Sequence, residues 1–280
     1  MPSWWLDSDM SNVAIITGAG SGFGLELAKK LIAKDWIVYA ADIDKVALKH
    51  AATFGARPLQ FDVTSDKQVS DGVAKVIKET GRVDLMVANA GFGTFASVEE
   101  TTPERVRALF EVNVFGVERS IRAVLPQMRK QGSGRILITA SVVATVSLVG
   151  LGWYAATKHA VRAVANALRQ EVKALGIQVS VIEPGTVRTN FDQVAFGHLR
   201  DSRTIGDYDK VMTGFNKWLG GLYRHSPGPD QVVKTMVRAA TATNAKPIYP
   251  ASWDVRVLKF VFLGFGRRIT DAAVLWLAKR

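Results

Sequence analysis

Short, mostly apolar runs alternate with amphipathic segments over the first two thirds of the chain. The runs at residues 13–16, 36–42 and 134–140 are typical of strands buried on both faces of a parallel sheet. Between them, apolar residues recur at helical spacing, and one such stripe predicts a long helix over residues 153–175. The alternation continues to about residue 184 and predicts one α/β domain, with a doubly wound parallel sheet and helices on both faces.

A glycine-rich turn joins the first run to the helix that follows it. Gly18, Gly22 and Gly24 fall there, with Ser21 and Phe23 between them. Backbone N–H groups at a helix N-terminus attract an anion, and glycines let a phosphate approach the backbone. The turn therefore predicts the pyrophosphate site of a dinucleotide. Its G-x-x-x-G-x-G spacing differs from the common G-x-G-x-x-G, and a flexible loop is the alternative.

Asp42 ends the second apolar run, 24 residues after Gly18. A carboxylate at this position accepts hydrogen bonds from the adenosine ribose hydroxyls and repels a 2′-phosphate. The glycine turn holds no basic residue, and none directly follows Asp42, so the sequence favours NAD over NADP as the cofactor. The alternative is that Asp42 only caps the next helix, a role that Asp44 can also fill.

Tyr154 and Lys158 lie four residues apart on the predicted long helix, so their side chains share one face. Ser141 follows the strand at residues 134–140, at the sheet edge where open parallel sheets bind ligands. A neighbouring ammonium lowers the pKa of a phenol, which makes Tyr154 a candidate general base, while Ser141 would orient the substrate oxygen. An interfacial tyrosine beside a solvated lysine is the alternative. Together with a dinucleotide site, the group predicts hydride transfer between a nicotinamide and an alcohol or carbonyl.

These motifs resemble those of the short-chain dehydrogenase/reductase family over roughly residues 11–250. The resemblance implies a single-domain Rossmann fold with about seven parallel strands, and an NAD(P)-dependent reaction at a CH–OH group. It also implies a homodimer or homotetramer. Residues 134–191 are similar to the steroid and retinol dehydrogenase branch of the family.

The resemblance assigns roles to further residues. It implies that Asp62 and Val63 bracket the adenine, and that Asn113 holds a water in a proton relay with Ser141, Tyr154 and Lys158. Beyond Tyr154 and Lys158, it places around the cofactor Asn89, Ala90, Gly91, Pro184, Gly185, Val187 and Thr189. Two of these have plainer alternatives: Asn89 as a turn former, and Asn113 as a buried amide bonded to the backbone.

The composition limits which binding partners and which cellular compartment we expect. With 280 residues, 48% of them hydrophobic, the chain can bury the core of one α/β domain. It has no cysteine, which favours a reducing compartment, and we expect a cytoplasmic protein. Its four histidines show no metal-ligand spacing, so we expect no metal site. The net charge of +11 comes without a basic recognition motif, and we expect no nucleic-acid partner.

The remaining segments flank this domain. We expect a tail over residues 1–11, the domain over 12–250, and an apolar, basic C-terminal tail over 251–280. From Trp253 to Arg280 the chain carries six basic and two acidic residues among many apolar ones, without a stretch long enough to span a bilayer. Such a segment either lies on an anionic membrane surface or packs against the protein or a partner subunit.

Two apolar segments predict the substrate class. Residues 142–153 lead into Tyr154, and an insertion over residues 190–229 would cover the substrate. An apolar pocket with few polar groups suits a hydrophobic alcohol, such as a steroid, a retinoid or another lipid-like molecule. The alternatives are an NAD(P)H-dependent carbonyl reductase for another substrate and a non-catalytic, cofactor-binding regulatory protein.

Overall fold

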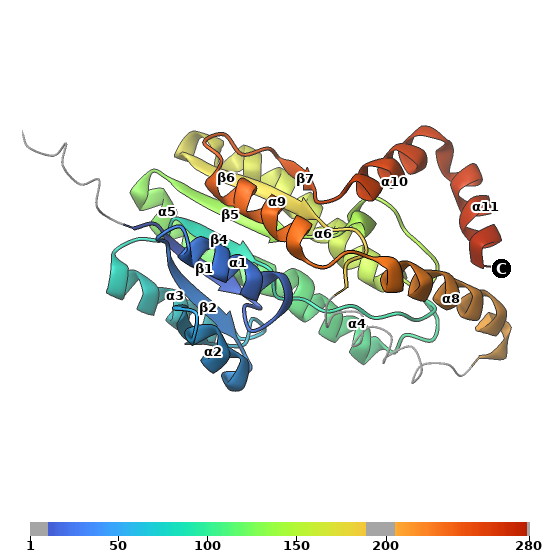
Figure 1. The fold of residues 1–280 in the computed structure, drawn as a ribbon, viewed down its shortest axis with the longest axis horizontal. Coiled ribbons are helices and arrows are strands. Elements are labelled where there is room, and N and C mark those ends of the chain that lie inside the picture. Colours follow the sequence, from blue (N-terminus) through green and yellow to red (C-terminus); the bar gives the residue numbers. More distant parts are fainter. Residues whose placement is uncertain (1–10, 189–204, 279–280) are drawn as a thin grey trace, which may run out of the picture.

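One sheet of seven parallel strands organises the molecule (Figure 1), and its strand order is β3-β2-β1-β4-β5-β6-β7. The computed structural model describes residues 11–188 and 205–278. The strands are β1 (Val13–Thr17), β2 (Ile37–Asp42), β3 (Arg57–Gln60), β4 (Leu85–Ala88), β5 (Gly134–Thr139), β6 (Ile177–Glu183) and β7 (Ile248–Pro250). The predicted doubly wound Rossmann fold with a seven-stranded parallel sheet is confirmed.

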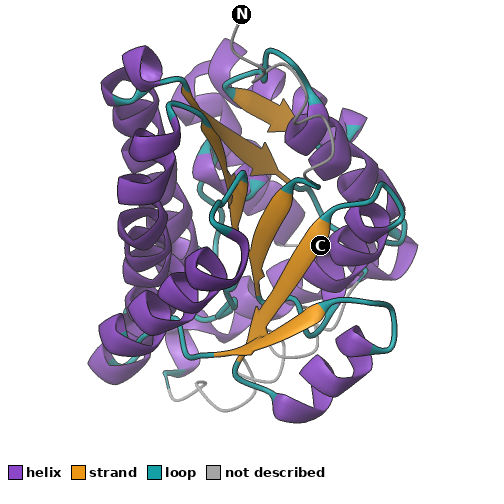
Figure 2. Ribbon diagram, turned by 90° about the vertical axis from the view of Figure 1, so that its left-hand side faces the viewer, coloured by secondary structure: helices purple, strands orange, loops and turns teal. Residues whose placement is uncertain are grey.

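Helices cover both faces of the sheet (Figure 2), because alternate residues of a strand point to opposite faces. Val13 and Ile15 of β1 belong to a buried cluster with the helices α3 (Asp66–Thr80), α5 (Gly116–Gln131) and α6 (Gly152–Glu171). Ala14 and Ile16 belong to a second cluster with α1 (Gly22–Ile32), α2 (Lys45–Ala52) and α9 (Asp230–Thr241).

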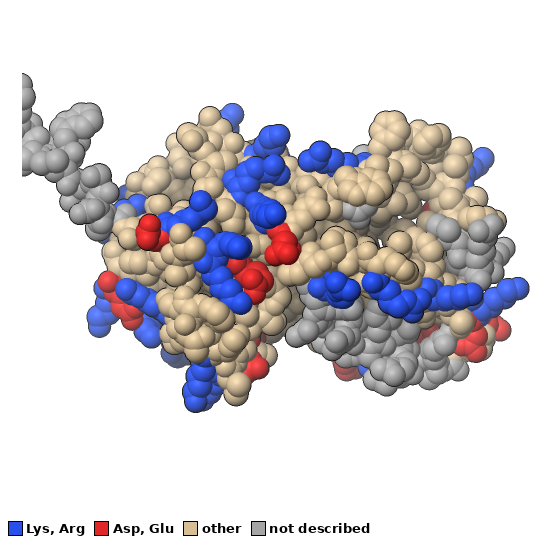
Figure 3. All heavy atoms as spheres, in the orientation of Figure 1, with Lys and Arg blue, Asp and Glu red and all other residues tan. Residues whose placement is uncertain are grey.

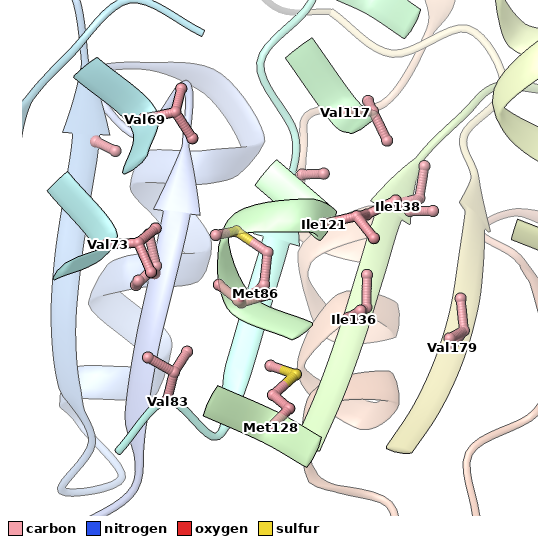
Figure 4. Packing of buried hydrophobic residues seen from close by; sticks show 14 of the residues in the cluster. Val69, Val73, Val83, Met86, Val117, Ile121, Met128, Ile136, Ile138 and Val179 are labelled. Atoms are coloured by element: carbon pink, nitrogen blue, oxygen red, sulfur yellow. The ribbon is translucent and has the colours of Figure 1, made fainter. Parts of the chain in front are cut away.

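The first cluster is the larger of these two. Figure 4 shows Met86 of β4 and Ile136 and Ile138 of β5 beside Ile121 and Met128 of α5. Burying an aliphatic side chain of this size stabilises the fold by about 1.5–3 kcal/mol. This packing fixes the central strands, and with them the loops that leave their carboxyl ends.

The strand order reverses between β1 and β4, and a ligand crevice is expected outside the carboxyl ends of the strands at such a point. A third buried cluster lies beyond this edge of the sheet. Its side chains come partly from the 3₁₀ turn Val142–Ala144, from α8 (Asp209–His225) and from α10 (Trp253–Gly264). The last helix, α11 (Gly266–Ala278), returns from α10 to pack against α8 (Figure 1).

The structure refines several expected boundaries. The helix expected over residues 153–175 ends at Glu171 and is followed by the 3₁₀ turn Lys173–Leu175. Val164 and Leu175, two of the apolar residues whose helical spacing predicts this helix, are exposed. The described part of the expected insertion forms the 3₁₀ turn Gly206–Tyr208 and α8. Residues 1–10 and 189–204 lie outside the described residues. Along the described ranges, no helix is long and apolar enough to cross a bilayer.

Candidate active site

The glycine turn closes tightly between β1 and α1. Gly18 has φ +65° and Gly22 has φ +54°, values that favour glycine. A Cβ on Gly18 would lie 2.9 Å from the Cα of Ala90, and a Cβ on Gly24 would lie 2.4 Å from the carbonyl oxygen of Gly18. Ser21 precedes α1 without a side-chain cap, so its hydroxyl does not occupy the N–H groups that start the helix. This is the geometry of an anion site at a helix N-terminus.

Asp42 is tied to this turn. Its Oδ2 atom accepts a hydrogen bond from the backbone N–H of Gly20 at 2.9 Å, and its Oδ1 accepts one from the N–H of Asp44 at 3.1 Å. Asp44 is the residue that caps α2, through the N–H groups of Val46 and Ala47. Asp42 therefore links the end of β2 to the glycine turn, and the cap alternative belongs to Asp44.

Asn89 joins three strand ends at the reversal point. Its Nδ2 donates to the carbonyl oxygen of Thr17 at 3.0 Å, and its Oδ1 accepts from the Thr139 hydroxyl at 3.1 Å. The Thr17 hydroxyl accepts from the backbone N–H groups of Asn89 and Ala90. Both the turn-forming and the cofactor-side interpretations of Asn89 fit this position, because the residue also lines the cavity described below.

Asp62 and Val63 lie in the loop between β3 and α3. The Asp62 Oδ1 accepts from the N–H of Thr64 at 2.8 Å, which folds the carboxylate into its own loop. Val63 is buried and contacts α5 where the chain has glycine, since a Cβ on Gly116 would lie 2.9 Å from the Val63 Cγ2.

Tyr154, Lys158 and Ser141 converge at the carboxyl end of β5. Tyr154 and Lys158 lie in the first two turns of α6 and are 8% and 5% exposed. The Lys158 Nζ lies 5.7 Å from the centre of the Tyr154 ring and donates to the carbonyl oxygen of Thr139 at 3.0 Å. The Ser141 side chain hydrogen-bonds to Tyr154. The three predicted catalytic side chains therefore share one buried site.

Burial dominates the protonation of this group. It raises the pKa of the Tyr154 phenol, nearby Tyr223 raises it further, and only the hydrogen bond from Ser141 lowers it. Burial also lowers the pKa of Lys158 from 10.5 to about 8. In the protein chain alone, desolvation of the phenolate therefore sets the direction of the shift, and a lowering of the Tyr154 pKa by Lys158 stays a prediction.

Asn113 sits behind the tyrosine and lysine in a π-helical segment, Glu111–Phe115, between α4 (Pro103–Phe110) and α5. It is fully buried. Its Nδ2 donates to the Phe92 carbonyl oxygen at 2.9 Å and to the Thr157 hydroxyl at 3.2 Å, and its Oδ1 accepts from the Phe92 N–H at 3.0 Å. The amide thus ties the loop after β4 to α6, which fits the plainer alternative, and a water relay through it stays a prediction.

The segment after β6 forms another border of the site that contains Ser141, Tyr154 and Lys158. The Pro184 carbonyl oxygen accepts from the N–H of Val142 at 2.8 Å, which joins this segment to the loop that carries Ser141. Val187 is buried. Thr189, expected beside the nicotinamide, lies outside the described residues.

One cavity of about 890 Å³ connects these features. Two of the predicted residues, Gly24 and Asn113, stand behind its wall. Those that line it are Gly18, Ser21, Gly22, Phe23, Asp42, Asp62, Val63, Asn89, Ala90, Gly91, Ser141, Tyr154, Lys158, Pro184, Gly185 and Val187.

A family model described as short chain dehydrogenase matches residues 12–198 of the chain. The chain belongs to the short-chain dehydrogenase family. It is similar to the 17-beta-hydroxysteroid dehydrogenase type 1 of Mus musculus, with 37% identity over 82% of this chain and 70% of the relative. It is also similar to the 3-ketodihydrosphingosine reductase of Bacteroides thetaiotaomicron, with 36% identity over 73% of this chain and 70% of the relative.

A solved structure also supports membership of this family. The short-chain dehydrogenase/reductase of Burkholderia phymatum, in complex with NAD, is 25% identical and superposes with a TM-score of 0.78 over 95% of each chain. These short-chain dehydrogenases differ in the substrate that their names give, so the family is established and the steroid and retinol branch is not. The chain is an NAD(P)-dependent oxidoreductase of this family.

The cavity fits the family's dinucleotide. A Cβ on Gly22 would meet no atom within 4 Å, so the backbone of the turn is open on that side. The turn would hold the pyrophosphate, and Lys158 would bind the ribose next to the nicotinamide. When bound, NAD(P) supplies the hydride acceptor or donor. Ser141 would orient the substrate oxygen toward Tyr154, whose phenolate would take the hydroxyl proton in oxidation and whose phenol would return it in reduction.

The part of the cavity beyond Tyr154, where we expect the substrate, is lined mostly by apolar side chains. Part of its wall comes from the loop before α6, through Val142, Val143, Leu148 and Leu151, and part from α8, through Trp218, Leu219, Leu222 and Tyr223. Sequence reasoning missed a third wall. It is formed by α10, through Trp253, Val255, Val257, Leu258 and Val261. Apolar residues 255, 258 and 262 at helical spacing in the tail were the available signal for a helix with a packed inner face.

Proposed function

We propose that this short-chain dehydrogenase interconverts a hydrophobic, lipid-like alcohol and its ketone or aldehyde with NAD as the preferred cofactor. The observation that carries the proposal is the cavity beyond Tyr154, whose three walls are apolar side chains from the loop before α6, α8 and α10. A pocket of this kind recognises a bulky apolar molecule and leaves the polar contacts to Ser141 and Tyr154.

Two further observations support the proposal. The names of two relatives give a steroid and a sphingoid base as substrates, which are different molecules with large apolar surfaces. At the adenosine end, the Asp42 carboxylate faces the cavity and would repel the 2′-phosphate of NADP.

The test is formation of reduced nicotinamide from NAD and from NADP, with steroid, retinoid and long-chain secondary alcohols as substrates. We expect turnover with NAD, and we expect Tyr154→Phe to lower kcat by about 10²–10⁴-fold while NAD still binds. Turnover that survives in Tyr154→Phe would contradict the role of the phenol. Reduction with NADPH as the faster reaction would favour the carbonyl reductase alternative, and NAD binding without turnover of any compound would favour the regulatory one.

We also propose a cytoplasmic location with two kinds of contact. A homodimer or homotetramer would use the α5 and α6 side of the molecule, where Phe115 and Val164 are exposed. A lipid surface would contact α10 and α11, where Phe260, Phe265 and Ile269 are more than half exposed. Figure 3 shows a largely uncharged surface over α10 and a row of Lys and Arg side chains along α8, an arrangement that suits an anionic membrane.

A further inference from the structure

A buried carboxylate stands where β6 ends, just before the segment that borders the nicotinamide side of the cavity. Glu183 is fully buried. Its Oε2 accepts a hydrogen bond from the Lys259 Nζ of α10 at 2.6 Å, and its Oε1 lies 3.5 Å from the Arg162 Nε of α6. Two cations from helices far apart in the sequence therefore meet on one carboxylate.

None of the three residues lines the cavity itself, but each lies on an element that does: Glu183 directly precedes Pro184, Arg162 follows Tyr154 and Lys158 on α6, and Lys259 lies on α10. Arg162 lies one turn after Lys158 and donates to the carbonyl oxygen of Ala144 at 3.1 Å and to the Thr145 hydroxyl, in the loop that follows Ser141. The backbone carbonyl oxygen of Glu183 accepts from the Ala251 N–H at 3.0 Å, which fixes the chain just before α10. The network thus joins α6, the Ser141 loop and α10.

Several described side chains of α10 are exposed, while Val255, Leu258 and Phe262 belong to or pack against the third buried cluster. Trp253 and Phe260 are each 72% exposed and Val257 is 50% exposed, whereas Val255 is buried. Among the described side chains of α10, Lys259 makes a short, charge-assisted bond to the sheet, and such bonds are about twice as strong as neutral ones. The Oε1 atom of Glu183 has no hydrogen bond, so the bond from Lys259 is the main polar contact of this carboxylate.

We propose that Lys259 is a positioning residue that determines substrate size. Its pair with Glu183 holds α10 against the end of β6, so that Val255, Leu258 and Val261 form the third wall of the substrate end. A helix released from this pair no longer presents a fixed apolar wall, and a bulky substrate loses contacts that a short alcohol never makes. The inference rests on the proposed function, because it assumes a hydrophobic substrate in this part of the cavity.

The test compares Lys259→Met with Lys259→Arg and with Arg256→Met, which removes a positive charge from an exposed position of the same helix. We expect Lys259→Met to raise KM for a bulky hydrophobic alcohol by about tenfold, with kcat and the KM for NAD changed less than about twofold. KM for a short secondary alcohol stays unchanged. Lys259→Arg restores the wild-type KM, and Arg256→Met has no effect.

Hydrogen exchange of the amides of α10, measured by mass spectrometry, provides a readout that needs no substrate. We expect faster exchange across α10 in Lys259→Met, with unchanged exchange in α6, and slower exchange again in Lys259→Arg. Unchanged exchange in Lys259→Met would overturn the anchoring role. Equal losses of kcat and of affinity for NAD would overturn the specificity role, because they indicate general damage. If the wild-type protein turns over no alcohol, the proposed function fails, while the exchange result still decides whether Lys259 holds α10.

Discussion

The Oδ2 atom of Asp42 accepts a hydrogen bond from the backbone N–H of Gly20 at 2.9 Å, so the residue that faces the adenosine end of the cavity also braces the glycine turn. A Cβ on Gly20 would lie 2.8 Å from the same oxygen, which shows how closely β2 and the turn approach each other. The carboxylate proposed to set the cofactor preference therefore also holds the turn proposed to bind the pyrophosphate.

Replacing this carboxylate should shift the cofactor preference. We expect Asp42→Ala to lower kcat/KM for NAD by roughly tenfold, because the ribose acceptor and the brace on Gly20 are lost, and to raise kcat/KM for NADP as the repulsion of the 2′-phosphate disappears. Steady-state kinetics with both cofactors measures this. Asp44→Ala is the matched control: it removes the cap of α2, at a cost of about 1 kcal/mol in stability, and should leave the preference unchanged. An unchanged NAD to NADP ratio in Asp42→Ala would contradict the role given to Asp42.

Ser141 should control the pH dependence of oxidation. Its hydrogen bond lowers the pKa of Tyr154, while burial raises it, and oxidation needs the phenolate, which exists above that pKa. In Ser141→Ala the pKa rises, so the ascending limb of kcat against pH moves to higher pH and the rate at neutral pH falls. In the reduction direction, which needs the phenol, activity should persist to higher pH. Ser141→Thr retains a hydroxyl and should keep the ascending limb of kcat against pH near its original position. An unmoved limb in Ser141→Ala would contradict the role given to the Ser141 hydrogen bond.

Local patterns in the sequence account for what could be predicted. The apolar runs of β1 and β5, the glycine turn and the four-residue spacing of Tyr154 and Lys158 are short-range features, and each reflects a requirement of one element. They were sufficient for the sheet, the convergence of the candidate catalytic group and the family.

Features that depend on distant contacts could not be predicted in the same way. Glu183 and Lys259 are 76 residues apart, and no periodicity connects them. The wall formed by α10 depends on the same contact, which is why the C-terminal tail was interpreted by charge and hydropathy alone. The raising of the Tyr154 pKa by burial could not be predicted either, because helix spacing does not reveal how deeply a side chain is buried.

Burial of Lys158 should make the protein less stable at neutral pH. Its pKa is lowered from 10.5 to about 8 in the folded state, so between these values the unfolded chain binds more protons than the folded one. The free energy of unfolding should therefore rise, through Lys158, as the pH increases from about 8 to about 10.5. Below pH 8 the destabilisation caused by burying the charged Lys158 should be complete.

Denaturant unfolding of Lys158→Met at several pH values tests this. We expect the variant to be more stable than the wild type at pH 7, with a difference that shrinks as the pH rises toward 10, while activity is lost. Lys173→Met, at an exposed position after α6, controls for the removal of a positive charge and should show no such trend. A constant difference across the pH range would contradict a protonation effect.

Contact of α10 and α11 with a lipid surface should depend on their exposed aromatic side chains. Phe260 is 72% exposed on α10, and burial of a phenylalanine contributes about 1.5–3 kcal/mol, so Phe260→Ser should weaken vesicle binding roughly tenfold or more. Flotation with phosphatidylcholine vesicles, with and without phosphatidylserine, measures the binding, and we expect it only with the anionic lipid and only at low salt. Phe54→Ser, at an exposed site after α2, is the matched control and should bind as the wild type does. Equal flotation of Phe260→Ser and Phe54→Ser, or no flotation of the wild type, would contradict the proposed lipid contact. The exposed face of α10 and α11 would then be assigned to a protein partner.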